Sequence, residues 1–338
     1  MNNKQKYNVA IVGATGLVGS TFLKVLSEYK FPIADLKLYA SSRSAGKAIM
    51  YEGHTYFVED LQQATFEGVD IALFSAGAAI SKSYAGIAEK AGAYVIDNSS
   101  AFRMDEDKAL IVPEINPQDY VGKSKIIANP NCSTIQVVVP LKVLHETFGL
   151  KRVVYTTYQA VSGSGQKGIN DLQNTLKGEK PGFYPYDISK TCIPQIDSFL
   201  DNHYTKEEIK MVNETRKILH LQNLRISATC VRVPVANSHA VSVMCDLEKD
   251  CDLEEVFMVL RGAPGVVLVD DIEKGLYPLS TIANGTDKVY VGRIRKDLSS
   301  ENGILFYTTC DNVRKGAASN AVQIAQYLIG GQNNDCCN

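Results

Sequence analysis

Cys132 stands in a segment whose pattern suits a reactive thiol. It follows Asn129-Pro130-Asn131, which come after a short apolar run, and a helical pattern begins near Ile135. The sulfur is therefore expected at or just before a helix N-terminus. The partial positive charge there favours the thiolate, and N–H groups of the first turn could stabilise an oxyanion. Because a lone cysteine is more often a small core residue, this pattern makes Cys132 a candidate nucleophile and no more.

A reactive thiol needs a base, and His239 is the histidine best placed for that role. It ends the polar turn Arg232–His239 (RVPVANSH), which separates two strong strand patterns. The other four histidines fall on expected helices or surface loops: His54, His145, His203 and His220. We therefore take Cys132 and His239 as a candidate nucleophile and acid/base pair.

A glycine-rich turn near the N-terminus has the form of a dinucleotide-binding site. Gly13–Gly19 (GATGLVG) follows the strand pattern 8–12 and opens a helical pattern that runs from Leu17 to about Glu28. Such glycines let the backbone approach a pyrophosphate, and the helix N-terminus attracts its charge. The alternative is a tight strand-to-helix turn without a ligand. The candidate cofactor residues of this turn are Gly13, Thr15, Gly16, Leu17 and Val18.

The end of the second strand indicates which dinucleotide would bind. Enzymes that use NAD usually place Asp or Glu there to hold the ribose 2′-hydroxyl. This strand is instead followed by Ser41, Arg43 and Ser44, whose hydroxyl and guanidinium groups suit a 2′-phosphate and predict NADP. A solvated loop arginine is the alternative. Ser75 and Gly77 end another strand at the same edge, where small residues permit close approach of a ligand.

The elements that must position these groups fall into two regions. The first 130 residues alternate short apolar strands with helical stretches, which predicts a parallel sheet covered on both faces. The expected strands are 8–12, 36–39, 70–74, 94–96 and 125–127, with a helix over 80–90. We therefore expect an α/β fold that begins with a Rossmann-type parallel sheet.

After Cys132 the strands become longer and more alternating, at 152–159, 225–233 and 240–247. Thr205 and Glu208 form a capping-box pattern for a helix that runs through His220. This region predicts an α+β domain with a mostly antiparallel sheet. Pro140 should kink or break the helix after Cys132. A helical segment over 312–328 could pack back on the first domain, so we expect domains of 1–130 with about 313–330, and of 131–312.

Composition excludes several classes of function. The 338 residues exceed the roughly 250–300 that one core usually serves, so two domains are expected. A formal charge of -2 gives no reason to expect a nucleic acid or an anionic membrane as partner, and no apolar run could span a bilayer. The polar start shows no signal peptide, and the eight cysteines include no C-x-x-C pair or metal site. We expect reduced thiols in the cytoplasm.

In combination these motifs resemble those of bacterial aspartate-semialdehyde dehydrogenases over essentially the whole chain. The resemblance is carried by Gly13–Gly19, Ser41–Lys47 (SSRSAGK), Ser99–Arg103 (SSAFR), Asn129–Thr134 (NPNCST), Gln159–Gly165 (QAVSGSG), Glu214–Lys217 (ETRK), Arg232–His239 and the final helix. No single motif would be specific.

The resemblance implies a role for each matching residue. Cys132 would form the acyl-enzyme, His239 would be the general acid/base, and Gln159 would orient the substrate. Arg232 would bind the amino-acid carboxylate and Glu214 the ammonium group. The remaining implied contacts are Arg103 and Lys217 with phosphate, and Ser162, Gly163 and Asn312 with the nicotinamide half of NADP. Without the resemblance, Glu214 and Lys217 would indicate only a surface ion pair on a helix.

The implied reaction is the NADPH-dependent conversion of 4-phospho-aspartate into aspartate semialdehyde and inorganic phosphate, in lysine, methionine and threonine biosynthesis. A homodimer, or a dimer of dimers, would form through the second domain. The nearest alternative is another phosphorylating acyl reductase, such as N-acetyl-glutamyl-phosphate reductase, which would not need Glu214. A catalytically inactive NADP-binding relative is a further alternative, although such proteins usually lose the nucleophile.

Overall fold

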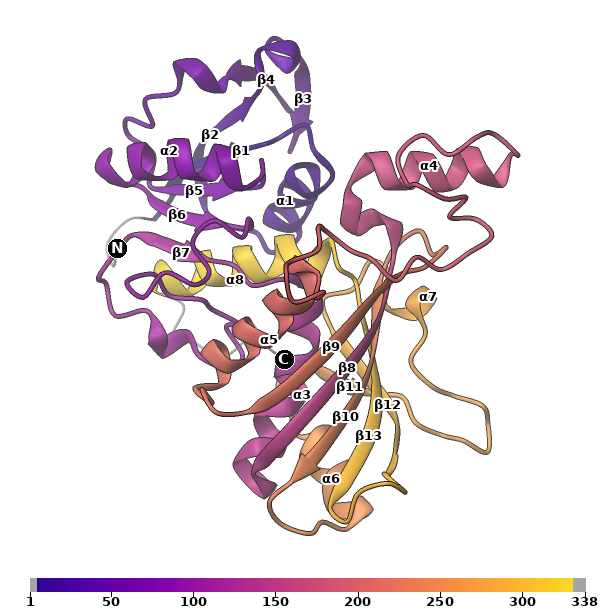
Figure 1. Ribbon diagram of the computed structural model, residues 1–338. Coiled ribbons are helices and arrows are strands. Elements are labelled where there is room, and N and C mark those ends of the chain that lie inside the picture. Colours follow the sequence, from indigo (N-terminus) through magenta and orange to yellow (C-terminus); the bar gives the residue numbers. More distant parts are fainter. Residues whose placement is uncertain (1–4, 331–338) are drawn as a thin grey trace. The chain divides into compact units, whose positions relative to one another are not determined.

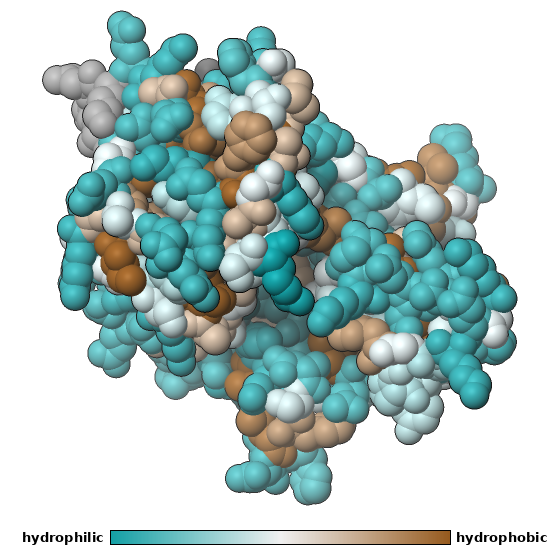
Figure 2. Space-filling model, turned by 90° about the horizontal axis from the view of Figure 1, so that it is seen from above, coloured by the Kyte–Doolittle hydropathy of each residue, from teal (hydrophilic) through white to brown (hydrophobic). Residues whose placement is uncertain are grey.

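A computed structural model describes residues 5–330 and divides the chain into two compact units (Figure 1). The first unit contains the chain up to Pro130 together with the segment that begins at Ala317, and the second unit runs from Asn131 to Gly316. None of the helices between residues 5 and 330 is long and apolar enough to cross a lipid bilayer. Polar groups dominate the face shown in Figure 2, with scattered apolar patches, because most large apolar side chains are buried.

The first unit is built on a seven-stranded sheet in the order β3-β4-β2-β1-β5-β6-β7. Six strands run parallel: β1 (Tyr7–Val12), β2 (Ile33–Ala40), β4 (His54–Asp60), β5 (Ile71–Phe74), β6 (Tyr94–Asp97) and β7 (Ile126–Ala128). All of them except β4 were predicted from the sequence. The edge strand β3 (Ala48–Tyr51) pairs antiparallel with β4 through the two-residue turn Glu52-Gly53, in which both residues have positive φ. This hairpin was not predicted from the sequence, because most of its side chains face solvent and leave no apolar pattern.

Helices cover both faces of this sheet. One face packs against α1 (Leu17–Glu28) and α8 (Ser319–Leu328), with Ile11 of β1 and Phe22 of α1 in the shared core. The other face packs against α2 (Ala78–Lys90), where Val12 and Ala85 meet in a second core. Alternate side chains of each strand therefore pack into the cores on opposite faces of the sheet. This is why the strands appear in the sequence as continuous apolar runs.

The second unit is built on a six-stranded sheet in the order β11-β12-β13-β10-β8-β9. Its strands are β8 (Leu150–Gln159), β9 (Arg225–Arg232), β10 (His239–Leu247), β11 (Val266–Leu268), β12 (Val289–Lys296) and β13 (Gly303–Cys310). The three central pairings are antiparallel, and the two outer ones, β8 with β9 and β11 with β12, are parallel. The prediction of a mostly antiparallel sheet is confirmed.

One face of this second sheet is covered by α3 (Cys132–Phe148), α5 (Lys206–Leu219) and α6 (Leu253–Arg261). Tyr155 of β8 points to this side and is hydrogen-bonded to Thr215 of α5 at 3.1 Å between the hydroxyl oxygens. The capping box predicted for α5 is present at Thr205 and Glu208. Two other helices, α4 (Gln166–Leu176) and α7 (Ser280–Ala283), lie outside this layer in Figure 1.

Helix α3 begins at Cys132, three residues before the expected start, and continues through Pro140 without a break. Of the two expected outcomes, a kink or a break, the break does not occur. Val137, Val138 and Leu141 surround Pro140 and are completely buried. Burial of each such side chain contributes about 1.5–3 kcal/mol, which together outweighs the roughly 3 kcal/mol that an interior proline costs.

Candidate active site

The candidate nucleophile occupies the first position of α3. Asn131 caps this helix, and its Oδ1 accepts hydrogen bonds from the N–H groups of Ser133 at 2.9 Å and Thr134 at 3.3 Å. Cys132 remains partly exposed between these buried neighbours. The cap thus engages two of the N–H groups that we expected to hold an oxyanion, so another donor is needed close to the reacting carbon.

Gly316, which was not among the residues predicted from the sequence, lies directly against the nucleophile. A β-carbon built on Gly316 would lie 2.9 Å from the β-carbon of Cys132, closer than real carbon atoms approach. Glycine at this position therefore lets the backbone support Cys132 at van der Waals distance. The available signal was a glycine inside the helical pattern 312–328, which is unfavourable in a helix unless packing requires it.

His239 is the first residue of β10 and is completely buried. Its Nδ1 accepts the backbone N–H of Ala160 at 3.0 Å, so the neutral ring carries its proton on Nε2. Nε2 has no hydrogen-bonding partner among residues 5–330. Burial, followed by the positive charge of Arg232, holds the pKa of His239 well below its usual value. The ring is therefore neutral near pH 7 and presents one N–H donor.

Arg232 and His239 meet at the turn that follows β8. Arg232 ends β9, and its Nη1 donates a hydrogen bond to the carbonyl oxygen of Ala160 at 2.7 Å. A β-carbon built on Gly163 would lie 2.8 Å from that Nη1 and 3.0 Å from Nε2 of His239. Gly163 therefore brings the backbone into contact with both side chains. The structure thus brings three of the expected residues together within the second unit.

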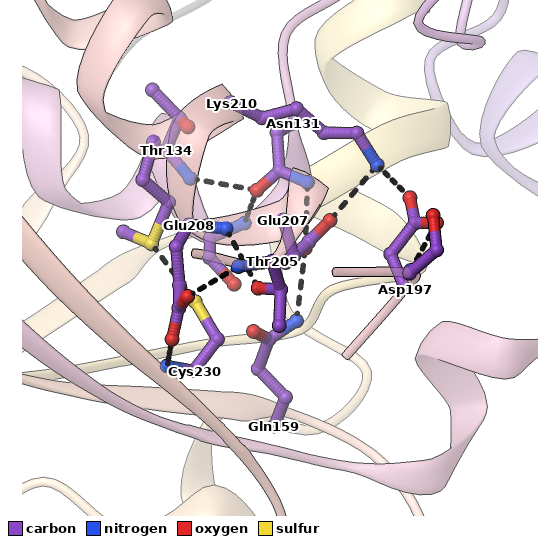
Figure 3. Close-up of polar contacts among 12 residues, drawn as sticks. Asn131, Thr134, Gln159, Asp197, Thr205, Glu207, Glu208, Lys210 and Cys230 are labelled. Atoms are coloured by element: carbon purple, nitrogen blue, oxygen red, sulfur yellow. Dashed lines mark hydrogen bonds and ion pairs between the residues drawn. The ribbon is translucent and has the colours of Figure 1, made fainter. Parts of the chain in front are cut away.

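A buried carboxylate joins Gln159 to the cap of the nucleophile helix (Figure 3). Oε1 of Glu207 accepts from Nε2 of Gln159 at 3.2 Å and from Nδ2 of Asn131 at 2.8 Å. Its Oε2 lies 3.1 Å from Nζ of Lys210. Glu207 was not predicted from the sequence, because an acidic residue in the first turn of a helix is ordinary.

Glu214 and Lys217 lie on the same helix, α5. Oε2 of Glu214, which is buried, accepts the backbone N–H of Asn131 at 2.6 Å. Glu214 therefore supports the residue before the nucleophile, a contact that the sequence did not suggest. Lys217 is partly buried one turn further along.

Ser162 and Asn312 are joined by hydrogen bonds. Nδ2 of Asn312 donates to Oγ of Ser162 at 2.9 Å, and Oδ1 of Asn312 accepts the N–H of Ser238 at 3.0 Å. Asn312 thereby ties the turn of Gly163 to the residue before His239. The segment after β13 thus supports the site in two ways, through Asn312 and through Gly316.

The glycine turn of the first unit forms a compact cradle at the start of α1. Gly13 has φ +90°, and a β-carbon on it would lie 2.6 Å from the carbonyl oxygen of Ser75. A β-carbon on Gly19 would lie 2.1 Å from the carbonyl oxygen of Gly13, so helix and turn pack without side chains between them. Gly16 caps α1 without a side-chain acceptor for the first N–H groups. This arrangement fits a pyrophosphate.

The other expected cofactor residues of the first unit lie close to this cradle. Oγ1 of Thr15 is 3.5 Å from Oγ of Ser44, which links the turn to the loop of Ser41 and Arg43. Leu17 and Val18 form the first turn of α1. Gly77, with φ +88°, caps α2 two residues after Ser75. The structure therefore groups these residues on one unit.

Arg103 also belongs to the first unit, where its guanidinium is buried against the backbone. Nε donates to the carbonyl oxygen of Asn129 at 2.9 Å, and Nη2 donates to that of Asn98 at 2.7 Å. Arg103 thus supports the chain three residues before Cys132 in the sequence.

The other cysteines divide into buried and exposed thiols. Cys230, Cys245, Cys251 and Cys310 are buried, and burial is the main cause that raises the pKa of each thiol. Cys192 is exposed, and Cys336 and Cys337 fall outside the described residues. Among the described cysteines, Cys132 alone is partly exposed at a helix N-terminus.

Comparison with known proteins gives a consistent result. Residues 8–122 match a family model described as "Semialdehyde dehydrogenase, NAD binding domain", and residues 141–315 match "Semialdehyde dehydrogenase, dimerisation domain". The aspartate-semialdehyde dehydrogenase of Aquifex aeolicus is 52% identical over 333 residues, covering 96% of this chain and 98% of that protein.

Two solved structures are also similar. Aspartate semialdehyde dehydrogenase II of Vibrio cholerae, complexed with ASA, superposes with a TM-score of 0.92 at 45% identity, covering 96% of this chain and 98% of that one. The enzyme of Candida albicans, solved with NADP, superposes with a TM-score of 0.74 at 26% identity, covering 96% and 98%.

Proposed function

Because this chain belongs to the aspartate-semialdehyde dehydrogenase family, we propose that it interconverts 4-phospho-L-aspartate and L-aspartate 4-semialdehyde through a thioester on Cys132. One observation carries the proposal. A single oxygen of Glu207 joins the residue before Cys132 to Gln159, and the next residue, Ala160, binds both His239 and Arg232. A nucleophile, a proton donor and a carboxylate-binding guanidinium are therefore held by one connected network.

The chemistry at sulfur follows from these positions. In the oxidative direction, the Cys132 thiolate attacks the aldehyde carbon, which forms a carbon–sulfur bond and leaves negative charge on the oxygen. Once a hydride has left that carbon, the acyl group remains on sulfur as a thioester. Phosphate then attacks the thioester, the carbon–sulfur bond breaks, and Cys132 departs as thiolate. The cell would run these steps in reverse to make the semialdehyde.

His239 would act on the oxygen of this intermediate. Its Nε2–H is the donor that the ring presents while Nδ1 accepts from Ala160. A neutral N–H donor stabilises an oxyanion as it forms and need not transfer its proton for the hydride to leave. The geometry therefore supports the proton-donor half of the acid/base role that the family resemblance implies.

Arg232 would bind the α-carboxylate of the substrate. Its guanidinium has five N–H donors, and among the described residues one of them donates a hydrogen bond, to the carbonyl oxygen of Ala160. The others can form a bidentate pair with a carboxylate. Glu214 would bind the ammonium group, although one of its oxygens is also engaged by Asn131. Arg103 and Lys217 would bind phosphate.

The cofactor would be NADP, held by the glycine cradle of the first unit and by Ser162, Gly163 and Asn312 of the second. When bound, its nicotinamide ring supplies or accepts the hydride. Ser41, Arg43 and Ser44 would hold the 2′-phosphate, and no Asp or Glu stands among the residues directly after β2. Preference for NADP over NAD rests on these three side chains.

A homodimer would form through the open face of the second sheet. Tyr158 and Tyr307 lie on that face with their ring centroids 6.1 Å apart, and Tyr158 is 39% exposed. Val154, Met244 and Leu305 are only half-buried beside them. An apolar sheet face of this kind is typical of a surface that a second copy covers. A reducing cytoplasm fits the free thiols of Cys192, Cys230, Cys245, Cys251 and Cys310.

The decisive experiment measures NADPH formation from L-aspartate 4-semialdehyde with and without phosphate. We expect turnover that depends on phosphate, because the thioester needs a phosphate oxygen to release its acyl group. Equal rates without phosphate would contradict acyl-phosphate formation. N-acetyl-glutamate semialdehyde serves as the comparison substrate, and a preference for it would replace the proposed substrate with that of the related reductase.

A further inference from the structure

Glu207 receives three donors from three different parts of the second unit. Nδ2 of Asn131, at the start of α3, and Nε2 of Gln159, at the end of β8, share its Oε1 (Figure 3). Nζ of Lys210 binds Oε2, and the same ammonium lies 2.9 Å from Asp197. Glu207 is 5% exposed, so solvent cannot replace these partners.

An ionised carboxylate only accepts hydrogen bonds, and this decides how two amides are turned. Asn131 must direct Nδ2 toward Glu207, which leaves Oδ1 to cap the N–H groups at the start of the nucleophile helix. Gln159 must likewise direct Nε2 toward Glu207, while its Oε1 accepts from Thr157 at 3.0 Å. Without the acceptor, either amide could rotate and present the wrong end.

Lys210 is what keeps this buried carboxylate charged. Burial alone would raise the pKa of Glu207, but the charge of Lys210 and the bonds from Asn131, Lys210 and Gln159 outweigh burial and lower it. Cys230, on β9, also faces this charge, and burial followed by Glu207 raises the pKa of its thiol, which therefore stays protonated.

We propose that Glu207, with Lys210 as its counter-ion, is a positioning residue that sets the orientation of Asn131 beside the nucleophile and of Gln159 beside the substrate. This inference rests on the proposed function, because it requires that Cys132 carries the reaction. The carboxylate itself touches no reacting atom and acts through the two amides.

The first experiment compares Glu207→Leu with Glu208→Leu in the full-length protein. Glu208 is the adjacent residue, is also buried, and accepts from the N–H groups of Thr205 and Cys230 without contacting either amide. Both variants should lose stability. Only Glu207→Leu should lose kcat, by about 10- to 100-fold per folded molecule, since misplacement of reacting groups by about 1 Å costs that much. The Kd for NADPH, measured by titration of the fluorescence of the reduced cofactor, should change less than twofold.

The second experiment uses Lys210→Met and needs no change at Glu207. Loss of the ammonium lets burial raise the pKa of Glu207, so the carboxyl should gain a proton as pH falls. A protonated carboxyl turns one acceptor into a donor. In a plot of kcat against pH, Lys210→Met should therefore show a decrease toward acid pH that the wild type lacks. The double variant Lys210→Met with Glu207→Gln should not show this acid limb. Asp197 is the other charged group beside Lys210, so Asp197→Asn is the control that should not create it.

The outcomes separate this inference from the proposed function. Equal kcat losses in Glu207→Leu and Glu208→Leu, or a wild-type kcat in Glu207→Leu, would overturn the positioning role of Glu207. The proposed reaction would still stand if the wild-type enzyme showed phosphate-dependent turnover. Should Glu207→Leu fail to fold, the absence of an acid limb in Lys210→Met would overturn it equally. Phosphate-independent or undetectable turnover in the wild type would instead refute the proposed function.

Discussion

Gly163→Ala is expected to damage catalysis far more than folding. The added methyl group would lie 2.8 Å from Nη1 of Arg232 and 3.0 Å from Nε2 of His239. An ordinary contact needs roughly 3.5 Å, so one or both groups must move by about 0.5–0.7 Å. Arg232 can yield at its flexible end, whereas His239 is held by its bond with Ala160. Gly163 does not have a positive φ, so alanine introduces no backbone strain.

The size of the effect follows from these displacements. A shift of 1 Å in a positioning group can cost about 100-fold in rate, so we expect kcat/KM to fall ~10- to 100-fold, or about 1.4–2.7 kcal/mol of transition-state stabilisation. The Tm should change little, because replacing Gly by Ala also removes about 0.4–1 kcal/mol of unfolded-state entropy where the backbone permits it.

The assay is NADPH formation from aspartate semialdehyde and phosphate, with thermal unfolding measured on the same sample. Gly182→Ala is the matched control in the same unit, because its methyl group would meet Asp171 at an ordinary 3.5 Å. The control should keep wild-type kinetics. Wild-type kinetics in Gly163→Ala would show that catalysis tolerates displacement of Arg232 or His239. The proposed requirement for glycine at position 163 would then be refuted.

The further predictions concern three individual side chains. Cys132→Ala should abolish turnover and Cys132→Ser should leave little, whereas retained activity in Cys132→Ala would end the covalent scheme. His239→Gln should slow the reaction but leave NADP binding intact, and an unchanged rate would remove its role on the oxygen. The pKa of His239 is lowered on folding, so below about pH 6.5 the unfolded chain binds more protons than the folded chain, and stability is lost as pH falls. His239→Gln should therefore show a smaller decrease of Tm between about pH 7 and 5 than the wild type. An equal decrease in both proteins would contradict this prediction. Arg43→Ala should raise the KM for NADP by about tenfold, equivalent to one lost charged contact, without affecting the KM for NAD, and wild-type preference for NAD would contradict the cofactor assignment.

Local rules let the sequence determine much of this protein. The glycine turn before α1 and the capping box of α5 each depend on residues a few positions apart, so they are confirmed at the expected places. Strand periodicity likewise predicts the two kinds of sheet, because burial on both faces or on one leaves different patterns. Cys132 could be identified as a candidate nucleophile for the same reason, because the residues next to it predict a helix N-terminus, which favours the thiolate.

Only the tertiary structure decided how these elements meet. Asn131 and Glu207 are 76 residues apart and Ala160 and His239 are 79 apart, so no periodicity links them. The continuity of α3 through Pro140 is also a tertiary result, because apolar burial outweighs a local helix breaker. The positions that must be glycine beside the site follow from the side chains that pack against them. Helices and turns thus depend on short-range terms that a sequence displays, whereas a shared buried hydrogen-bond acceptor exists only once distant segments have packed together.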